Sequence, residues 1–253
     1  MTSEKIRGHM PSEHVLIVVP SLTHTVSAAV MHLAAASQRF NIPRRFTVRT
    51  LAGLKGYDFV RNCAVQSFMA GDYDRLWMID DDIMPTEDVF ALLDVDADIV
   101  APLMPTLKWD MGENTFNFHV AYAAGRYSDI NDLSTAVDID ISGGGVVDVD
   151  MVGTGCTIIR REVLEDPRMC YDASDLEDDE PRPIFRYHRK SNGAHKRGED
   201  EDFCVRAKLL GYSVKLHTGI ETGHRDQIDI AHVMKMRRHY EALASHNPVA
   251  EAI

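Results

Sequence analysis

The sequence lacks the cysteine pairs and the long apolar runs that mark several classes of protein. Its four cysteines, Cys63, Cys156, Cys170 and Cys204, form no Cys-x-x-Cys pair and no dense framework. This spacing gives no indication of a structural zinc site or a disulfide scaffold, and it favours a reducing compartment. The longest apolar run, Val15 to Val19, is far too short to span a membrane, and no signal-peptide pattern opens the chain. We therefore expect a cytoplasmic protein with no membrane span.

An excess of positive charge is also missing. The chain has 27 basic and 39 acidic residues, which gives a net charge of -12. This balance disfavours a surface dedicated to nonspecific nucleic-acid binding, although Arg186 to Lys190, His195 to Arg197 and Lys235 to Arg238 form local basic patches. No internal repeat of useful length is present. With 253 residues, of which 45% are hydrophobic, the chain can bury one sizeable core, so residues 1–253 are predicted to form a single domain.

The stretch that organises the rest of the sequence runs from Arg75 to Pro85. Here the apolar residues Leu76 to Ile79 read as a buried strand and lead directly into three carboxylates. Residues two apart on a strand point to the same side, so we expect Asp80 and Asp82 to converge while Asp81 faces elsewhere. Two hard oxygen donors suit Mg²⁺ or Mn²⁺. The alternative interpretation is an acidic loop that is merely solvated.

Strands and helices alternate around this stretch, which is typical of an α/β fold with a parallel sheet. Ligands of such sheets bind beyond the carboxyl ends of the strands, where Pro20 and Ser21 also lie. The predicted elements are a strand at Val15–Val19, a helix from Val26 to about Phe40 capped by Thr23 or Thr25, a strand at Phe46–Leu51, a helix at Asp58–Met69 ended by Gly71, a short helix at Glu87–Leu93 and a strand at Ile99–Met104.

Arg61 and Asn62 lie near the first turn of the predicted helix at Asp58–Met69. Free N–H groups and a positive dipole end make a helix N-terminus a suitable place for a diphosphate or a nucleotide, which an arginine would help to hold. The alternative is an ordinary exposed pair of polar side chains, since arginine and asparagine are mostly found on surfaces.

The second half of the chain is less regular. Residues Pro105 to Gly145 carry aromatic side chains among Gly, Asn and Asp, which suggests loops and short hairpins whose rings either stack on a ring substrate or form an irregular core. Val146 to Val152 alternates as a strand. Gly153 and Gly155 follow, and because a strand comes next and a third glycine is absent, they indicate close backbone approach to a ligand and not a dinucleotide fingerprint.

A charged segment and an acidic helix start come next. Residues 172–197 are rich in charge and poor in aliphatics, which predicts a mobile loop that orders when a ligand binds. Gly198 to Leu210 reads as a helix with Gly211 at its end. The acids in its first turn, Glu199 and Asp200 among them, either offset the helix dipole or supply a general base. A strand at Ser213–His217, the pair Gly223-His224 and a helix from Ile228 to Ala244 complete the chain.

These pieces, in this order, resemble the GT-A glycosyltransferases, particularly the compact family-2-like members. The resemblance covers Val15 to about Arg225, and it consists of a first strand ending in Pro-Ser, an Arg-Asn helix, an Asp-x-Asp strand, a Gly-x-Gly strand before Arg-Arg-Glu-Val-Leu, a Gly-Glu-Asp-x-Asp-Phe-Cys helix and a late Gly-His. It implies a Rossmann-like three-layer sandwich with a mostly parallel central sheet. It also implies a nucleotide-sugar-binding half at 14–105 and an acceptor-binding and catalytic half at 106–253.

The resemblance also implies roles for particular residues. Mn²⁺ or Mg²⁺ would bridge the donor diphosphate and would be held by Asp80, Asp82 and His224, although a single histidine can equally be structural. Asp80 or Asp81 would approach the ribose. Asp200 would be the general base, beside Glu199. The remaining expected contacts line the nucleotide pocket or approach the donor sugar and acceptor, and they are Pro20, Ser21, Arg61, Asn62, Gly153 and Gly155.

The implied reaction is transfer of a sugar from a nucleoside-diphosphate sugar, expected to be a UDP-sugar, to an acceptor hydroxyl. A cation would offset charge on the leaving oxygens and a carboxylate would take the hydroxyl proton. One base without a second nucleophile predicts inversion. The acceptor is a glycan, a lipid-linked sugar, a protein or a hydroxymethylated base in phage DNA. The alternatives are a nucleotidyltransferase on the same fold and a catalytically inactive carbohydrate-binding relative. A haloacid-dehalogenase-like phosphatase is disfavoured by Met84.

Overall fold

A central seven-stranded sheet organises the molecule. The computed structural model describes residues 13–21, 32–33, 35–36, 44–112, 115–172, 180–189 and 195–225. The strand order is β2 (Arg44–Ala52), β1 (Glu13–Ser21), β3 (Arg75–Ile79), β11 (Cys156–Arg160), β5 (Ile99–Leu103), β14 (Val214–Glu221) and β9 (Val146–Asp148). Only β11 and β9 run antiparallel to their neighbours, so the sheet is mostly parallel as predicted.

The two strands that deliver the predicted site are buried over most of their length. Val15 to Val19 of β1 and Leu76 to Ile79 of β3 have no exposed surface, which explains their unbroken apolar sequence. β1 pairs in parallel with β2 on one side and with β3 on the other. The next strand after β1 is added on one side of it and β3 on the other, so the strand order has a switch point between β1 and β3. Such a switch point opens a crevice beyond the carboxyl ends of the strands.

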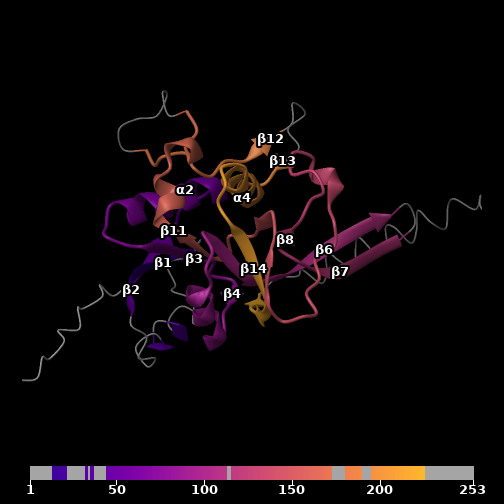
Figure 1. Cartoon of the computed structure of the whole chain (residues 1–253), viewed down its shortest axis with the longest axis horizontal. Helices are drawn as coiled ribbons and strands as arrows, with labels where there is room; N and C mark the ends of the chain where they lie inside the picture. The colour runs from indigo at the N-terminus through magenta and orange to yellow at the C-terminus, as the bar shows by residue number, and fades with distance from the viewer. Residues whose placement is uncertain are drawn as a thin grey trace, which may run out of the picture.

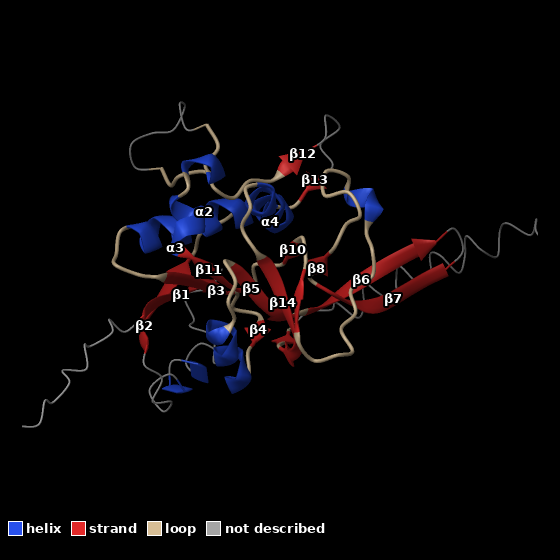
Figure 2. Cartoon of the chain, in the orientation of Figure 1, coloured by secondary structure: helices blue, strands red, loops and turns tan. Residues whose placement is uncertain are grey.

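Helical segments cover both faces of the sheet (Figures 1 and 2). One face carries α2 (Tyr57–Met69), α3 (Arg161–Glu165) and α4 (Glu199–Leu209), and the opposite face carries η1 (Glu87–Asp94), a 3₁₀ helix where a short helix was predicted. The resulting three layers are those that the resemblance implied. Gly211 follows α4 with φ of 97°, a left-handed conformation that glycine adopts without strain.

Two predictions about strands were wrong in detail. Strand β3 ends at Ile79, and residues 80–82 form a turn in which Ile83 N donates to Asp80 O at 3.1 Å. The alternation of a strand therefore does not govern the direction of the three carboxylates. The predicted strand Val146–Val152 is split into β9 and β10 (Met151–Val152), because the chain leaves β14 and pairs with β8 (Ala124–Gly125) instead.

The middle of the chain forms a hairpin that projects from the sheet (Figure 1). It consists of β6 (Pro105–Gly112) and β7 (Thr115–Tyr122), paired from Pro105 with Tyr122 to Gly112 with Thr115. The expected hairpin is therefore present, with longer strands than predicted. The remaining short elements are β4 (Ile83–Met84), η2 (Leu133–Thr135), η3 (Pro167–Met169), β12 (His188–Arg189), β13 (His195–Arg197) and β15 (Gly223–His224).

Some predictions lie wholly or largely outside the described residues. These are the caps Thr23 and Thr25, most of the helix Val26–Phe40, the helix Ile228–Ala244, and residues 173–179 and 190–194 of the predicted mobile loop. The four cysteines are free thiols. Among the described residues, no helix has both the length and the apolar character needed to cross a membrane.

Candidate functional site

A cavity of about 250 Å³ lies beyond the carboxyl ends of β1 and β3. It combines the predicted residues of the first strand and the acidic turn with a loop and a helix start that the sequence did not single out. The lining residues are Pro20, Ser21, Leu54, Lys55, Gly56, Tyr57, Val60, Arg61, Asp80, Asp81 and Asp82. All three carboxylates of the turn line this cavity, including Asp81, which strand alternation had directed elsewhere.

Arg61 and Asp80 form a two-pronged ion pair at the base of the cavity. Arg61 donates from Nη1 to Asp80 Oδ1 at 2.5 Å and from Nη2 to Asp80 Oδ2 at 2.7 Å. Arg61 is only 4% exposed, and its Nε has no partner. Burial by itself lowers the pKa of the guanidinium, but Asp80, Asp200 and Glu199 outweigh it and raise that pKa above its usual value. Arg61 therefore carries a permanent positive charge into the cavity.

Asp82 and His224 lie side by side although they are far apart in the sequence. β4 pairs antiparallel with β15, so Ile83 is opposite His224. This pairing places His224 Nε2 3.5 Å from Asp82 Oδ2, and Arg225 N donates to Asp82 O at 2.8 Å. Burial and the charge of Asp80 raise the pKa of the Asp82 carboxyl, with His224 opposing the rise. The sequence predicted this pair as metal ligands.

The Asp82 and His224 side chains meet part of what a divalent metal requires. His224 Nδ1 lies 2.8 Å from Pro105 O, so a proton on Nδ1 would bond that carbonyl and leave the Nε2 lone pair facing Asp82. A backbone carbonyl that fixes the second ring nitrogen is usual for metal-binding histidines. Asp80 is held by Arg61 instead. Within the described residues, no three His, Cys, Asp or Glu side chains lie close enough to form a complete metal site.

The two predicted glycines lie against protein atoms. A Cβ on Gly155 would come within 3.3 Å of Asp80 Oδ2, and a Cβ on Gly153 would come within 2.8 Å of the Ala123 Cβ. Gly155 O also accepts a hydrogen bond from Asp80 N at 2.8 Å. At Gly155 the missing side chain gives the Asp80 carboxylate room beside β11, and the predicted approach of both glycines to a ligand stays a prediction.

The start of α4 brings a second pair of carboxylates toward the site. Asp200 Oδ2 accepts a hydrogen bond from Thr154 N at 3.3 Å, which ties Asp200 to the stretch between the two glycines. Glu199 is only 4% exposed. Burial and the charge of Asp200 raise the pKa of Glu199 to about 7, against the opposing effects of a hydrogen bond from Tyr187 and the charge of Arg61. One of these carboxyls is thus poised to change its protonation state near neutral pH.

Asn62 lies behind the cavity and is not part of its lining. Its Nδ2 donates to Phe185 O at 2.9 Å, and its Oδ1 accepts from Ile184 N at 3.0 Å and Phe185 N at 2.8 Å. The side chain is 6% exposed. In this structure the Asn62 side chain therefore holds a distant backbone segment, whereas the sequence predicted a nucleotide contact.

Three residues beside the site were not singled out from the sequence. Lys55 and Tyr57 line the cavity, and Tyr57 is 65% exposed. Tyr187 hydrogen-bonds to Glu199 and packs edge-on against Tyr57, with 6.5 Å between ring centroids. The only available signal was the position of Lys55 and Tyr57 after the second strand, in a loop punctuated by Gly53 and Gly56. Nothing in the local sequence distinguished Tyr187 from the other residues of its charged segment.

The sheet order, the crevice and the covering helices define an α/β protein of the GT-A type of fold. No protein-family model and no curated protein sequence matches the chain. Among solved structures, GalNAc-T7 with UDP, GalNAc and Mn²⁺ matches with a TM-score of 0.51 at 13% identity, over 85% of this chain and 44% of that one. The chain thus spans less than half the length of GalNAc-T7. At this identity the comparison shows a shared fold.

Two further solved structures show weaker similarity. A197 from STIV matches with a TM-score of 0.46 at 16% identity, over 85% of this chain and 86% of that one. CMP:2-keto-3-deoxy-manno-octonic acid synthetase complexed with CTP matches with a TM-score of 0.42 at 11% identity, over 91% of this chain and 99% of that one.

Proposed function

We propose that the protein is a metal-dependent glycosyltransferase that moves a sugar from a nucleoside-diphosphate sugar to an acceptor hydroxyl. The observation that carries the proposal is the meeting of three groups at one sheet edge. These are a cavity lined by Pro20, Ser21 and the acidic turn, the Asp82–His224 pair beside it, and Asp200 on a neighbouring helix. The structure of GalNAc-T7 with UDP, GalNAc and Mn²⁺ shares the fold, which is why a UDP-sugar is the first donor to test.

The donor is assigned to the half formed by residues 14–105, because every residue that lines the cavity belongs to it. The nucleoside would lie against Pro20, Ser21 and Tyr57. Arg61 holds Asp80 in a fixed position, from which the carboxylate can accept hydrogen bonds from ribose hydroxyls. Lys55 contributes a second positive charge for the diphosphate.

Asp82 and His224 would hold Mn²⁺ or Mg²⁺, with phosphate oxygens of the donor and water completing its coordination. When bound, the cation would offset the negative charge that develops on the leaving diphosphate. The chain itself supplies one carboxylate and one imidazole already in position, so the donor has to complete the site. We therefore expect metal and donor to bind together.

Asp200 is proposed as the general base in the half formed by residues 106–253. The acceptor oxygen attacks the anomeric carbon, its proton passes to Asp200, and the bond from that carbon to the phosphate oxygen breaks with its electron pair leaving on the nucleoside diphosphate. One base and a direct attack give inversion at the anomeric carbon. A glycan and a hydroxymethylated base in phage DNA are the two acceptor classes to test first.

The test is release of nucleoside diphosphate from a panel of nucleotide-sugars with Mn²⁺, with and without EDTA. We expect release with at least one donor, loss of release with EDTA, and loss of transfer in Asp200→Asn with donor binding retained. The product analysis separates sugar transfer from nucleotidyl transfer, because the second reaction would release pyrophosphate or a sugar phosphate. No release with any donor, or full transfer by Asp200→Asn, would overturn the proposal.

A further inference from the structure

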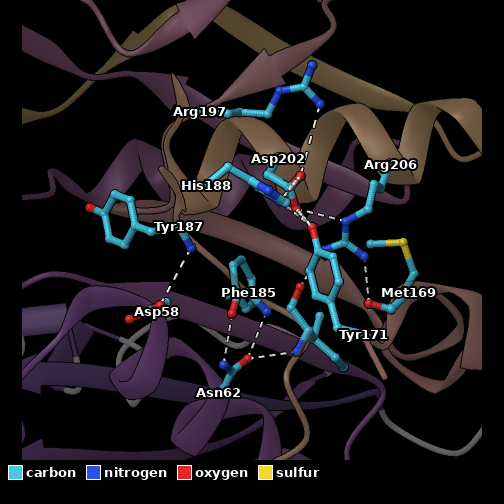
Figure 3. A network of polar contacts seen from close by, with 11 residues as sticks. Asp58, Asn62, Met169, Tyr171, Phe185, Tyr187, His188, Arg197, Asp202 and Arg206 are labelled. Atoms are coloured by element: carbon cyan, nitrogen blue, oxygen red, sulfur yellow. Dashed lines mark hydrogen bonds and ion pairs between the residues drawn. The ribbon is translucent and has the colours of Figure 1, made fainter. Parts of the chain in front are cut away.

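A segment outside the predicted site connects the donor cavity to the acid-bearing helix. This segment, Ile184 to His188, crosses between α2 and α4 (Figure 3). On the α2 side, Asn62 makes three hydrogen bonds to the backbone of Ile184 and Phe185. Tyr187 N also donates to Asp58 Oδ2 at 3.5 Å. The segment is thus anchored to the same helix that carries Arg61.

On the α4 side, the segment is anchored by two charged residues of that helix. Arg206 donates to Ile184 O and, through Nε, to Asp202 Oδ2 at 2.8 Å. Asp202 is 3% exposed and also accepts from the Tyr171 hydroxyl at 2.5 Å, while His188 Nε2 lies 3.0 Å from its Oδ1. The aspartate and its partners converge in Figure 3. Because Asp202 is buried, these contacts fix the segment relative to the start of α4.

Between these two anchors, the segment presents Tyr187 to the site. The Tyr187 ring packs edge-on against Tyr57, which lines the donor cavity, and its hydroxyl hydrogen-bonds to Glu199. Burial and this hydrogen bond raise the pKa of the Tyr187 hydroxyl, so it stays protonated and donates to the carboxyl. One side chain therefore touches a wall of the cavity and a residue of the acidic pair.

We propose that Tyr187 is a positioning residue that holds the Glu199 carboxyl in place beside Asp200 and thereby sets the charge next to the proposed base. The proposal rests on the proposed function only in calling Asp200 a base. The charged and titratable groups that act on Glu199 are Asp200 on its own helix, Tyr187 from the 184–188 segment and Arg61 from α2. Of these, Tyr187 supplies the hydrogen bond.

The proposal predicts in which direction the pKa of Glu199 changes when the Tyr187 hydroxyl is removed. A hydrogen bond donated to a carboxylate favours its ionised form. Removing the hydroxyl in Tyr187→Phe leaves burial and the charge of Asp200 in place, so Glu199 should hold its proton more tightly. A hydrogen bond to a charged group is worth enough to change the proton affinity of Glu199 about tenfold.

The first test needs no substrate. The carboxyl carbons of ¹³C-labelled glutamate are followed by NMR as pH changes, and the Glu199 signal is assigned by its absence in Glu199→Gln. We expect the Glu199 midpoint to move about one pH unit toward higher pH in Tyr187→Phe, which is a tenfold change in proton affinity. The matched control is Tyr171→Phe, which removes a hydroxyl bonded to Asp202 of the same helix and leaves the Glu199 contact intact. An unchanged midpoint in Tyr187→Phe, or an equal shift in Tyr171→Phe, overturns the proposal.

A second variant keeps both the ring and the hydroxyl, so it gives a test even if Tyr187→Phe does not fold. 3-Fluorotyrosine at position 187 has a more acidic hydroxyl and is a stronger donor, so the Glu199 midpoint should move to lower pH; a move to higher pH or none overturns the proposal. In the transfer assay, the inflection in the plot of kcat against pH that is lost in Glu199→Gln belongs to Glu199. In each Tyr187 variant this inflection should shift in the same direction as the NMR midpoint of Glu199. Failure of transfer with every donor would reject the proposed function alone, because the NMR result does not depend on it.

Discussion

Asn62→Ala gives the most direct measure of how the two sides of the site are held together. The Asn62 side chain makes three hydrogen bonds to the backbone of Ile184 and Phe185, at 2.8 to 3.0 Å, and it is 6% exposed. Alanine would leave the Phe185 N–H and the Phe185 carbonyl without this partner, whereas Ile184 N keeps its hydrogen bond to Arg182 O at 2.9 Å. Each such group costs about 1 to 3 kcal/mol, so the free energy of unfolding should fall by about 2 kcal/mol or more.

The assay is urea unfolding followed by circular dichroism, with the midpoint compared at constant slope. The control is Thr86→Ala, an exposed position before η1 whose side chain makes no capping hydrogen bond, where a surface substitution should change the free energy of unfolding by less than about 0.5 kcal/mol. A wild-type midpoint for Asn62→Ala, together with weakened nucleotide binding, would refute this reasoning. It would mean that Asn62 contacts the ligand, as its place in the sequence first predicted.

Three further predictions concern the site itself. His224→Ala should weaken Mn²⁺ binding in the presence of UDP by at least about tenfold, measured by titration calorimetry; an unchanged affinity would contradict the assignment. Gly155→Ala places a Cβ 3.3 Å from Asp80 Oδ2, so the carboxylate must move and the KM for the donor should rise, whereas an unaltered KM would remove Asp80 from the donor site. The pKa of Glu199 is raised from 4.5 to about 7 on folding. The folded state therefore binds the proton more tightly, and the free energy of unfolding should fall between about pH 5 and pH 7 by up to about 1.4 kcal/mol per pH unit. Urea unfolding at several pH values should show this slope in the wild type and a smaller one in Glu199→Gln, and equal slopes would contradict it.

The parts of the fold that sequence reasoning predicted well are those in which one local pattern settles the structure. The unbroken apolar runs of β1 and β3 could only be buried strands, and their carboxyl ends then had to meet at one sheet edge. Pro20, Ser21 and the acidic turn therefore line one cavity, as expected. Flanking glycines also located α2 and α4 to within one or two residues.

Other features depend on contacts between distant segments, which no local pattern encodes. Asp82 faces His224 only because two-residue strands pair across the sheet edge. Asn62 was predicted as a ligand contact because of its place near a helix start, but its side chain bonds to the backbone of Ile184 and Phe185, which are far away in the sequence. Tyr187 lies in a charged segment without periodicity, so its contact with Glu199 could be recognised only in three dimensions.

The pairing of β4 with β15 has a consequence for biosynthesis. The ribosome synthesises Asp82 early and His224 near the end of the described chain. The His224 imidazole therefore cannot reach the Asp82 carboxylate until the strands between them have been made. A nascent or truncated polypeptide that ends before Gly223 would leave Asp82 without His224, whereas Asp80 would already have Arg61 as its partner. The proposed metal site would thus stay incomplete until β15 has been synthesised.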